Sequence, residues 1–348
     1  MKKWYSYIIL LLVCIGFASC QDNGTVPEPQ TDGRVSVHLQ IALPGGDPAE
    51  RGAQARDFTD GGTDDTTERQ KTIIKGDVYV LVFQGNTFKG SVPITSVTNQ
   101  SGNSNVKVLE GTFDATGLFG SSLKLVVLAN LNQNGVNTTF SEGISESELY
   151  NSLIYSYDGT QTPWNTDTSS NYRRIPMWGT TSTFTLSANQ LTQSCDMHRA
   201  VAKLGFLIDG GRGYGNKFKI TGITIKGAMN KGKCKSGADF SNNYYIAPDV
   251  PVDAGTQTIK YEGLHITTSY ENKIYLPEQD IAERPLTITV AYEQNGVTKE
   301  KDIEFSENVI RNHSYIYNIT VKDENVIVLS YDVYDWQDGG RVAVPPFE

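Results

Sequence analysis

The feature that most constrains the fold is the repeated alternation of apolar and polar residues in short segments separated by turn residues. Residues 35–43 (VSVHLQIAL) alternate strictly, which is the period of a half-buried strand. The apolar residues of this strand, which share one face, are Val35, Val37, Leu39, Ile41 and Leu43. Residues 78–83 and 123–129 are almost continuously apolar instead, which predicts central strands packed on both faces.

The second half of the chain repeats this pattern. Further strands are expected at residues 200–208, 218–225, 286–292, 297–305, 314–321 and 326–334. Gly222 is a candidate bulge, and Asn295-Gly296 between two of these segments is a strong hairpin signal. Ser145 and Glu148 form a capping box that predicts one short helix. The sequence therefore predicts an all-β fold of two antiparallel β-sandwich domains, residues 35–190 and 191–348, with one short helix.

The N-terminus reads as an export signal. Lys2 and Lys3 precede the apolar run 8–17, which is too short to span a bilayer stably. Small residues directly before Cys20 are typical of a bacterial lipoprotein, in which residues 1–19 are removed and Cys20 is acylated. Residues 20–34 would then be a flexible tether. The alternative is an ordinary secretory signal cleaved near Cys20.

Residues 44–71 have no periodicity and are rich in Gly, Asp and Thr, which predicts a long exposed loop. So long a loop directly after a strand is often functional. Among its arginines, Arg51 and Arg56 are the candidate sites for a protease, because exposed loops are where cleavage concentrates.

Charge and motifs argue against several functions. The net charge of −9 and the absence of a basic patch argue against nucleic acid as a partner. The four histidines show no metal-ligand spacing, and the chain has no Walker loop, dinucleotide fingerprint or serine elbow. We therefore expect no enzyme activity, metal or cofactor. Cys195 and Cys234 form either a disulfide or two buried free thiols, and the sequence leaves both open.

Trp164 and Trp178 lie in a region rich in tyrosine and offer two interpretations. They form a stacking platform for sugars, or they fill the end of a sandwich, which we favour.

The C-terminal segment 326–334 is an apolar strand that follows an apparently complete domain. It either closes its own sheet, the commoner case, or lies in a groove of another subunit by strand addition. The residues assigned to this donor strand are Val326, Val328, Tyr331, Val333 and Trp336.

Several short motifs, taken in order, resemble those of the lipoprotein-type fimbrillins of Bacteroidetes, the subunits and anchors of type V pili. The motifs are Cys20 with its preceding small residues, the strand 35–43 with its arginine-bearing loop, Ile175-Pro-Met-Trp-Gly179, His198-Arg-Ala-Val-Ala-Lys203, Tyr275-Leu-Pro-Glu278, Arg311-Asn-His-Ser-Tyr315 and Val333-Tyr-Asp-Trp336.

The resemblance implies two transthyretin-like β-sandwiches and export as a lipidated outer-membrane precursor. An arginine-specific surface protease would cut after Arg51, or else after Arg56, and remove the first strand. The C-terminal strand of one subunit would then fill the groove of the next, giving a homo- or heteropolymer that supports adhesion. The alternatives are an uncleaved fimbrial anchor, a non-polymerising glycan-binding lipoprotein and, less favoured, a surface hydrolase. No adhesion target is indicated.

Overall fold

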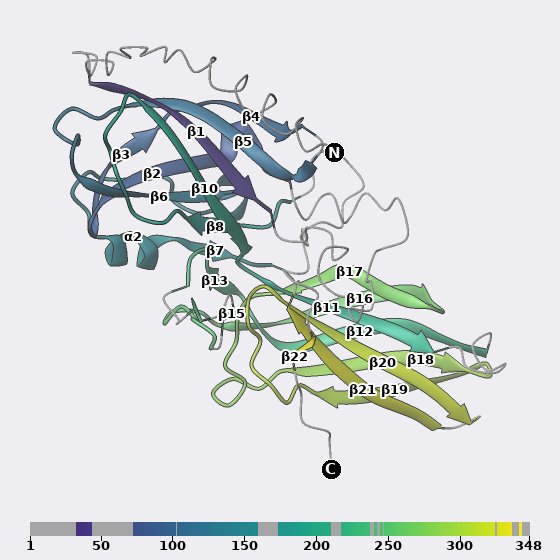
Figure 1. The fold of residues 1–348 in the computed structure, drawn as a ribbon. Coiled ribbons are helices and arrows are strands. Elements are labelled where there is room, and N and C mark those ends of the chain that lie inside the picture. Colours follow the sequence, from purple (N-terminus) through teal and green to yellow (C-terminus); the bar gives the residue numbers. More distant parts are fainter. Residues whose placement is uncertain are drawn as a thin grey trace, which may run out of the picture.

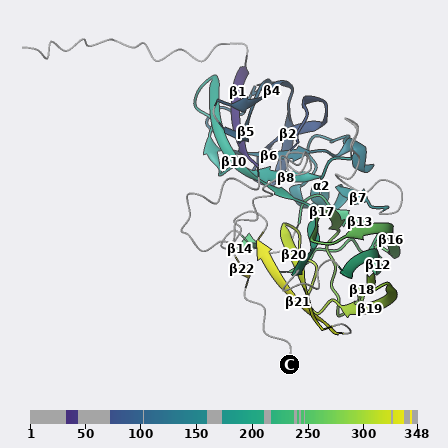
Figure 2. The same cartoon turned by 90° about the vertical axis from the view of Figure 1, so that its right-hand side faces the viewer.

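The computed structural model describes residues 33–43, 72–101, 103–158, 173–209, 217–236, 240–241, 244–245, 247–323, 326–335 and 341–342. The described chain is built mainly of β-strands, arranged in two halves that lie one beyond the other (Figures 1 and 2). Its one described α-helix is α2 (Glu146–Ser152). The expected all-β fold of two sandwich domains with one short helix is confirmed.

The N-terminal half is one long, curved sheet. Its strands are β1 (Arg34–Ala42), β2 (Val78–Gln84), β3 (Thr87–Val92), β4 (Ile94–Gln100), β5 (Asn103–Asp114), β6 (Ser122–Ala129), β8 (Met177–Thr180), β9 (Phe184–Thr185) and β10 (Gln190–Arg199). Their order is β3-β2-β6-β8-β10-β1-β5-β4, with β9 paired to β6. Only Pro93 separates β3 from β4, although they stand at opposite ends of this order, so the sheet folds back on itself.

The fold of this sheet creates a core between its two arms. Val37 and Leu39 of β1 share one hydrophobic cluster with Val80 of β2 and Leu125 of β6. The neighbouring residues on the other face of β2 and β6, such as Leu81, join a second cluster that contains residues of α2. The two apolar runs are therefore buried on both faces, as their sequence predicts.

Helix α2 starts where its capping box predicts. The Ser145 hydroxyl accepts from the Glu148 backbone N–H, and the Glu148 carboxylate accepts from the Ser145 backbone N–H. Two short 3-10 helices, Lys75–Asp77 and Asn132–Asn134, flank the sheet. The helix buries Leu149 and Tyr150 against the outer face of the sheet.

The C-terminal half is a sandwich of two sheets, β17-β11-β20-β21-β22 and β16-β12-β18-β19. Its strands are β11 (Ala202–Asp209), β12 (Phe218–Met229), β16 (Thr256–Ile266), β17 (Ser269–Leu276), β18 (Thr287–Gln294), β19 (Val297–Glu304), β20 (His313–Asp323), β21 (Val326–Asp335) and β22 (Arg341–Val342). The register shifts beside Gly222, which confirms the bulge. Asn295 and Gly296 both have positive φ, as a tight hairpin of this kind requires.

Two short ladders complete the described strands. β7 (Ile154–Ser156) pairs with β13 (Lys231–Lys233), and β14 (Phe240–Ser241) pairs with β15 (Tyr244–Tyr245). One pair in each half is parallel, β1 with β10 and β11 with β20, and the remaining pairs are antiparallel. Strand β10 belongs to the N-terminal sheet. The expected domain boundary at 190/191 therefore lies at the first residues of β10, before the chain passes into β11 of the C-terminal half.

Candidate assembly site

Strand β1 lies inside the N-terminal sheet, with a neighbour on each side. On one side it pairs in parallel with β10, from Ser36 opposite Gln190 to Ala42 opposite Asp196. On the other side it pairs antiparallel with β5 over its full length. Both backbone edges of β1 are therefore satisfied by these two strands (Figure 1).

The side chains of β1 divide by face as their alternation predicts. The five residues assigned to assembly, Val35, Val37, Leu39, Ile41 and Leu43, are all at most 4% exposed. Between them lie polar residues that face outward, and the His38 Nδ1 atom is 3.8 Å from a Glu110 carboxylate oxygen on that outer surface. The strand therefore holds its place through apolar burial on one face and backbone pairing at both edges.

The ends of β1 are also fixed to β5. The Ala115 N–H donates to the Gly33 carbonyl oxygen at 2.8 Å, and the Leu43 N–H donates to the Asn105 carbonyl oxygen at 2.7 Å. After Leu43 the chain continues into residues 44–71, which lie outside the described residues together with Arg51 and Arg56. That segment is the covalent link between β1 and the rest of the folded chain.

Removal of β1 would leave a gap inside the sheet, because β1 is not an edge strand. β8, on the other side of β10, pairs with only Met197–Arg199 of that strand, so β1 is the only described strand partner of the part of β10 from Gln190 to Asp196. β5 keeps β4 on its other edge. Apolar side chains of the flanking strands and of the facing arm would be exposed, namely Val80, Val82, Leu109, Phe113, Leu125, Val127, Leu191 and Cys195.

The C-terminal strand closes its own sheet in this structure. β21 pairs antiparallel with β20 from Val326 opposite Asp323 to Asp335 opposite His313. On its other edge, β22 pairs only with Val333 and Tyr334. Of the residues assigned to a donor strand, Val333 is buried, whereas Trp336 and the side chains of Val326, Val328 and Tyr331 lie outside the described residues.

Trp178 is not an exposed platform. It is 5% exposed, its ring centroid lies 5.4 Å from that of the His198 ring at a tilt of 33°, and the Lys235 Nζ lies 4.6 Å from its centroid. The same ammonium group lies 4.4 Å from the Tyr150 ring centroid. Trp178 therefore fills the base of the N-terminal half, the interpretation we favoured, and Trp164 lies outside the described residues.

Cys195 and Cys234 are both buried and free. Cys195 belongs to the cluster beneath β1, and Cys234 belongs to the cluster that continues into the C-terminal half. Burial raises the pKa of each thiol to about 12, so neither is a reactive thiolate near neutral pH. The alternative of two buried thiols describes this structure.

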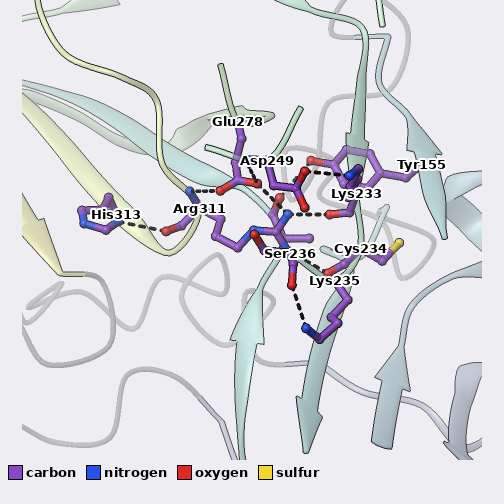
Figure 3. Close-up of polar contacts among 10 residues, drawn as sticks. Tyr155, Lys233, Cys234, Lys235, Ser236, Asp249, Glu278, Arg311 and His313 are labelled. Carbon is purple, nitrogen blue, oxygen red and sulfur yellow. Dashed lines mark hydrogen bonds and ion pairs between the residues drawn. The ribbon is translucent and has the colours of Figure 1, made fainter. Parts of the chain in front are cut away.

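A buried ion pair that the sequence did not indicate lies where the two halves meet. The Arg311 guanidinium and the Glu278 carboxylate are 2.6 Å apart, and the two side chains are 0% and 1% exposed. The guanidinium also donates to the carbonyl oxygens of Cys234 (3.0 Å) and Lys233 (2.9 Å) (Figure 3). Arginine in a motif such as Arg311-Asn-His-Ser-Tyr315 carries no sequence signal for burial, because arginine is normally exposed.

Among the described residues, no group of three or more His, Cys, Asp or Glu side chains is placed to hold a metal ion. None of the helices in the described ranges is long and apolar enough to cross a membrane.

Residues 156–336, just over half of the chain, match the model of the fimbrillin-like family. The chain therefore belongs to the fimbrillin-like family, as its motifs suggested. No curated protein matches the sequence.

Solved structures of proteins from Bacteroides and Porphyromonas species match this chain. One is a candidate cell adhesion protein from Bacteroides uniformis, with 14% identity, a TM-score of 0.45, and coverage of 89% of this chain and 100% of that one. Another, from Bacteroides eggerthii, has 14% identity, a TM-score of 0.46, and coverage of 87% and 96%. The fimbrial anchor protein Mfa2 from Porphyromonas gingivalis has 6% identity, a TM-score of 0.39, and coverage of 86% and 96%.

Proposed function

We propose that this protein is a structural subunit of a cell-surface fimbrium that supports adhesion and has no catalytic role. In this proposal it is exported as a lipoprotein precursor attached to the outer membrane through Cys20. An arginine-specific protease then cuts after Arg51 or Arg56, and subunits join by strand exchange. Membership of the fimbrillin-like family supports the general role. The placement of β1 supports the mechanism.

The observation that carries the mechanism is that β1 is a central strand, joined to the fold that follows it only through residues 44–71. A cut in residues 44–71 would leave β1 held only by non-covalent contacts with β10, β5 and the core beneath it. An incoming strand that runs in the direction of β1, with apolar side chains at alternate positions, would restore both hydrogen-bond ladders and refill the same core.

The C-terminal strand has the complementary position. β21 lies next to the edge of its sheet, where the two-residue strand β22 covers only a small part of it. An edge strand leaves its sheet without splitting it, whereas a central strand leaves a gap with unpaired backbone on both sides. The N-terminal half thus has a central strand that a cut would release, and the C-terminal half has a terminal strand near the edge of its sheet. Head-to-tail assembly needs both.

An uncleaved anchor is the second candidate, because it would keep β1 in place as seen here and remain on the membrane through Cys20. A glycan-binding lipoprotein loses support, since Trp178 is buried.

The decisive measurement is the N-terminal sequence and intact mass of the protein purified from the surface of the cells that make it. A chain that starts at Gly52 or Asp57, in SDS-resistant ladders, is the expected result. An Arg51→Gln/Arg56→Gln double variant should remain uncut, and Arg69→Gln in the same loop should be processed normally. A wild-type chain that starts at acylated Cys20 would overturn the polymerising role and favour the anchor.

A further inference from the structure

Two residues connect the strand that holds β1 to the C-terminal sandwich. β10 ends at Arg199 and β11 begins at Ala202, so Ala200 and Val201 alone separate them. β10 carries β1 on one side, β11 carries β20, and β20 carries β21. These two residues are therefore the direct backbone connection between the strand that carries β1 and the C-terminal sandwich.

The backbone of this connection is bonded from both halves. The Ala200 N–H donates to the Pro176 carbonyl oxygen, and the Tyr155 hydroxyl donates to the Ala200 carbonyl oxygen, each at 2.9 Å. From the C-terminal half, the Asn312 N–H donates to the Val201 carbonyl oxygen at 2.9 Å. Both residues are fully buried, so water does not compete for these bonds.

A second contact between the halves is made by residues 230–236, which we call the bridging segment. On the N-terminal side it pairs with β7 through β13. The pairing is extended at both ends by backbone bonds of 2.8 Å, from the Tyr157 N–H to the Asn230 carbonyl oxygen and from the Cys234 N–H to the Leu153 carbonyl oxygen. Lys235, the next residue, lies against the Tyr150 and Trp178 rings.

On the C-terminal side the bridging segment is held by Arg311. Its guanidinium donates to two consecutive carbonyl oxygens of the segment, those of Lys233 and Cys234. Glu278 neutralises the guanidinium at 2.6 Å and also accepts from the Arg311 backbone N–H at 3.2 Å (Figure 3). The Lys233 ammonium adds a 2.6 Å ion pair with Asp249. A charge buried this completely is tolerated only when it is paired and hydrogen-bonded, as it is here.

We infer that the junction is a locked hinge, in which Arg311 and Glu278 are positioning residues that hold the bridging segment and so fix the two halves in one relative orientation. The pair acts through the segment that joins the halves, because the guanidinium donates to the carbonyl oxygens of Lys233 and Cys234. In a fimbrium this would fix the angle between the groove of one subunit and the strand given to the next. That consequence rests on the proposed function, whereas the locking itself is a property of the single subunit.

The test measures the distance between the halves in the isolated subunit. Spin labels are placed at Thr98→Cys in β4 and Thr298→Cys in β19, both exposed. The chain starts at Gln21, which keeps every described element and removes Cys14 and Cys20. The two remaining thiols are buried and free, so labelling is selective. Wild type is expected to give one narrow distance distribution by pulsed electron spin resonance.

The junction variant is Glu278→Met/Arg311→Met, which removes both charges together and avoids leaving one buried without its partner. Its matched control is Lys219→Met/Glu293→Met, which removes a 2.9 Å ion pair at the surface of the same half, away from the junction. We expect the junction variant to broaden the distance distribution at least twofold and the control to match wild type. A folded junction variant with the wild-type width would overturn the inference.

A milder variant covers the case in which the double substitution prevents folding. Tyr155→Phe removes the hydroxyl group that donates to the Ala200 carbonyl oxygen. Hydrogen exchange of the Ala200 and Asn312 amides should then be at least tenfold faster than in wild type. Unchanged protection of both amides would count against a locked hinge. Neither readout depends on polymerisation, so these results stand apart from the test of the proposed function.

Discussion

Leu39→Ala tests how strongly β1 is held in the subunit before any cut. Leu39 is the middle of the five buried residues of β1 and is fully buried. It lies opposite Leu109 of β5, also fully buried, and beside Gln193 of β10. Its side chain reaches the core shared with Val80 and Leu125.

The expected loss of unfolding free energy follows from how completely the Leu39 side chain is enclosed. Leucine-to-alanine substitutions in protein cores cost about 2–5 kcal/mol, and the cost rises with the cavity that remains. Paired strands on both sides of Leu39 limit how far the site can collapse, so we expect about 3–4 kcal/mol at this position. The matched control is Gln40→Ala, because Gln40 is the next residue and belongs to the outward face, where substitutions usually change stability by about 0.5 kcal/mol or less.

The assay is urea unfolding of the uncut chain that starts at Gln21. All variants are fitted with one m value, the slope of the unfolding free energy against urea concentration. A loss for Leu39→Ala smaller than about 1 kcal/mol, or equal to that of Gln40→Ala, would refute the assignment of β1 as a tightly held core strand. The proposed function adds a second expectation. A fimbrium assembled from Leu39→Ala subunits should be as stable as wild type, because β1 would no longer be present.

Three further predictions concern the rest of the molecule. Gly232→Ala should destabilise the chain by about 1–3 kcal/mol in urea unfolding, since its added Cβ would lie 2.2 Å from the Tyr155 hydroxyl oxygen, and an unchanged midpoint would contradict this contact. Cys195 and Cys234 should resist a thiol reagent at pH 8 until the chain unfolds, because burial raises the pKa of each to about 12; rapid labelling of the native chain would refute this. Burial lowers the pKa of His313, so the unfolded chain gains a proton that the folded chain does not, and stability should fall as the pH drops below about 6.5. His313→Gln should flatten that dependence, and parallel curves would exclude His313 as its source.

Alternation and turn chemistry predicted the strands that bury one or both faces. β1, β2, β6, β12, β18 and β20 all lie close to their expected positions, and Asn295-Gly296 closes the expected hairpin. Strand β16 was missed for a physical reason. It lies at the edge of its sheet, only Ile259 and Ile266 of its eleven residues are buried, and exposed Glu262 and Gly263 interrupt its alternation. β19 is equally exposed but was found because it follows the Asn-Gly turn.

The sequence could not reveal which strands are neighbours. The parallel pairing of β1 with β10 joins segments more than 150 residues apart, and each has its own apolar alternation that fits many partners. The same limit applies to the donor strand. The sequence identified an apolar terminal strand, but its alternation could not show that this strand pairs with β20 of its own chain.

The motifs that suggested the family lie mainly at the junction rather than at the groove. Pro176, Ala200, Glu278, Arg311 and Asn312 come from four of those motifs, and all contribute to the bonds that join the two halves. A strand that moves between subunits needs only backbone pairing and alternating apolar side chains, which many sequences supply. A buried guanidinium aimed at two carbonyl oxygens needs arginine and a paired carboxylate at defined places. The motif residues are therefore mainly those that bond the two halves together, and the strands that we propose to exchange are expected to tolerate more substitution than these residues.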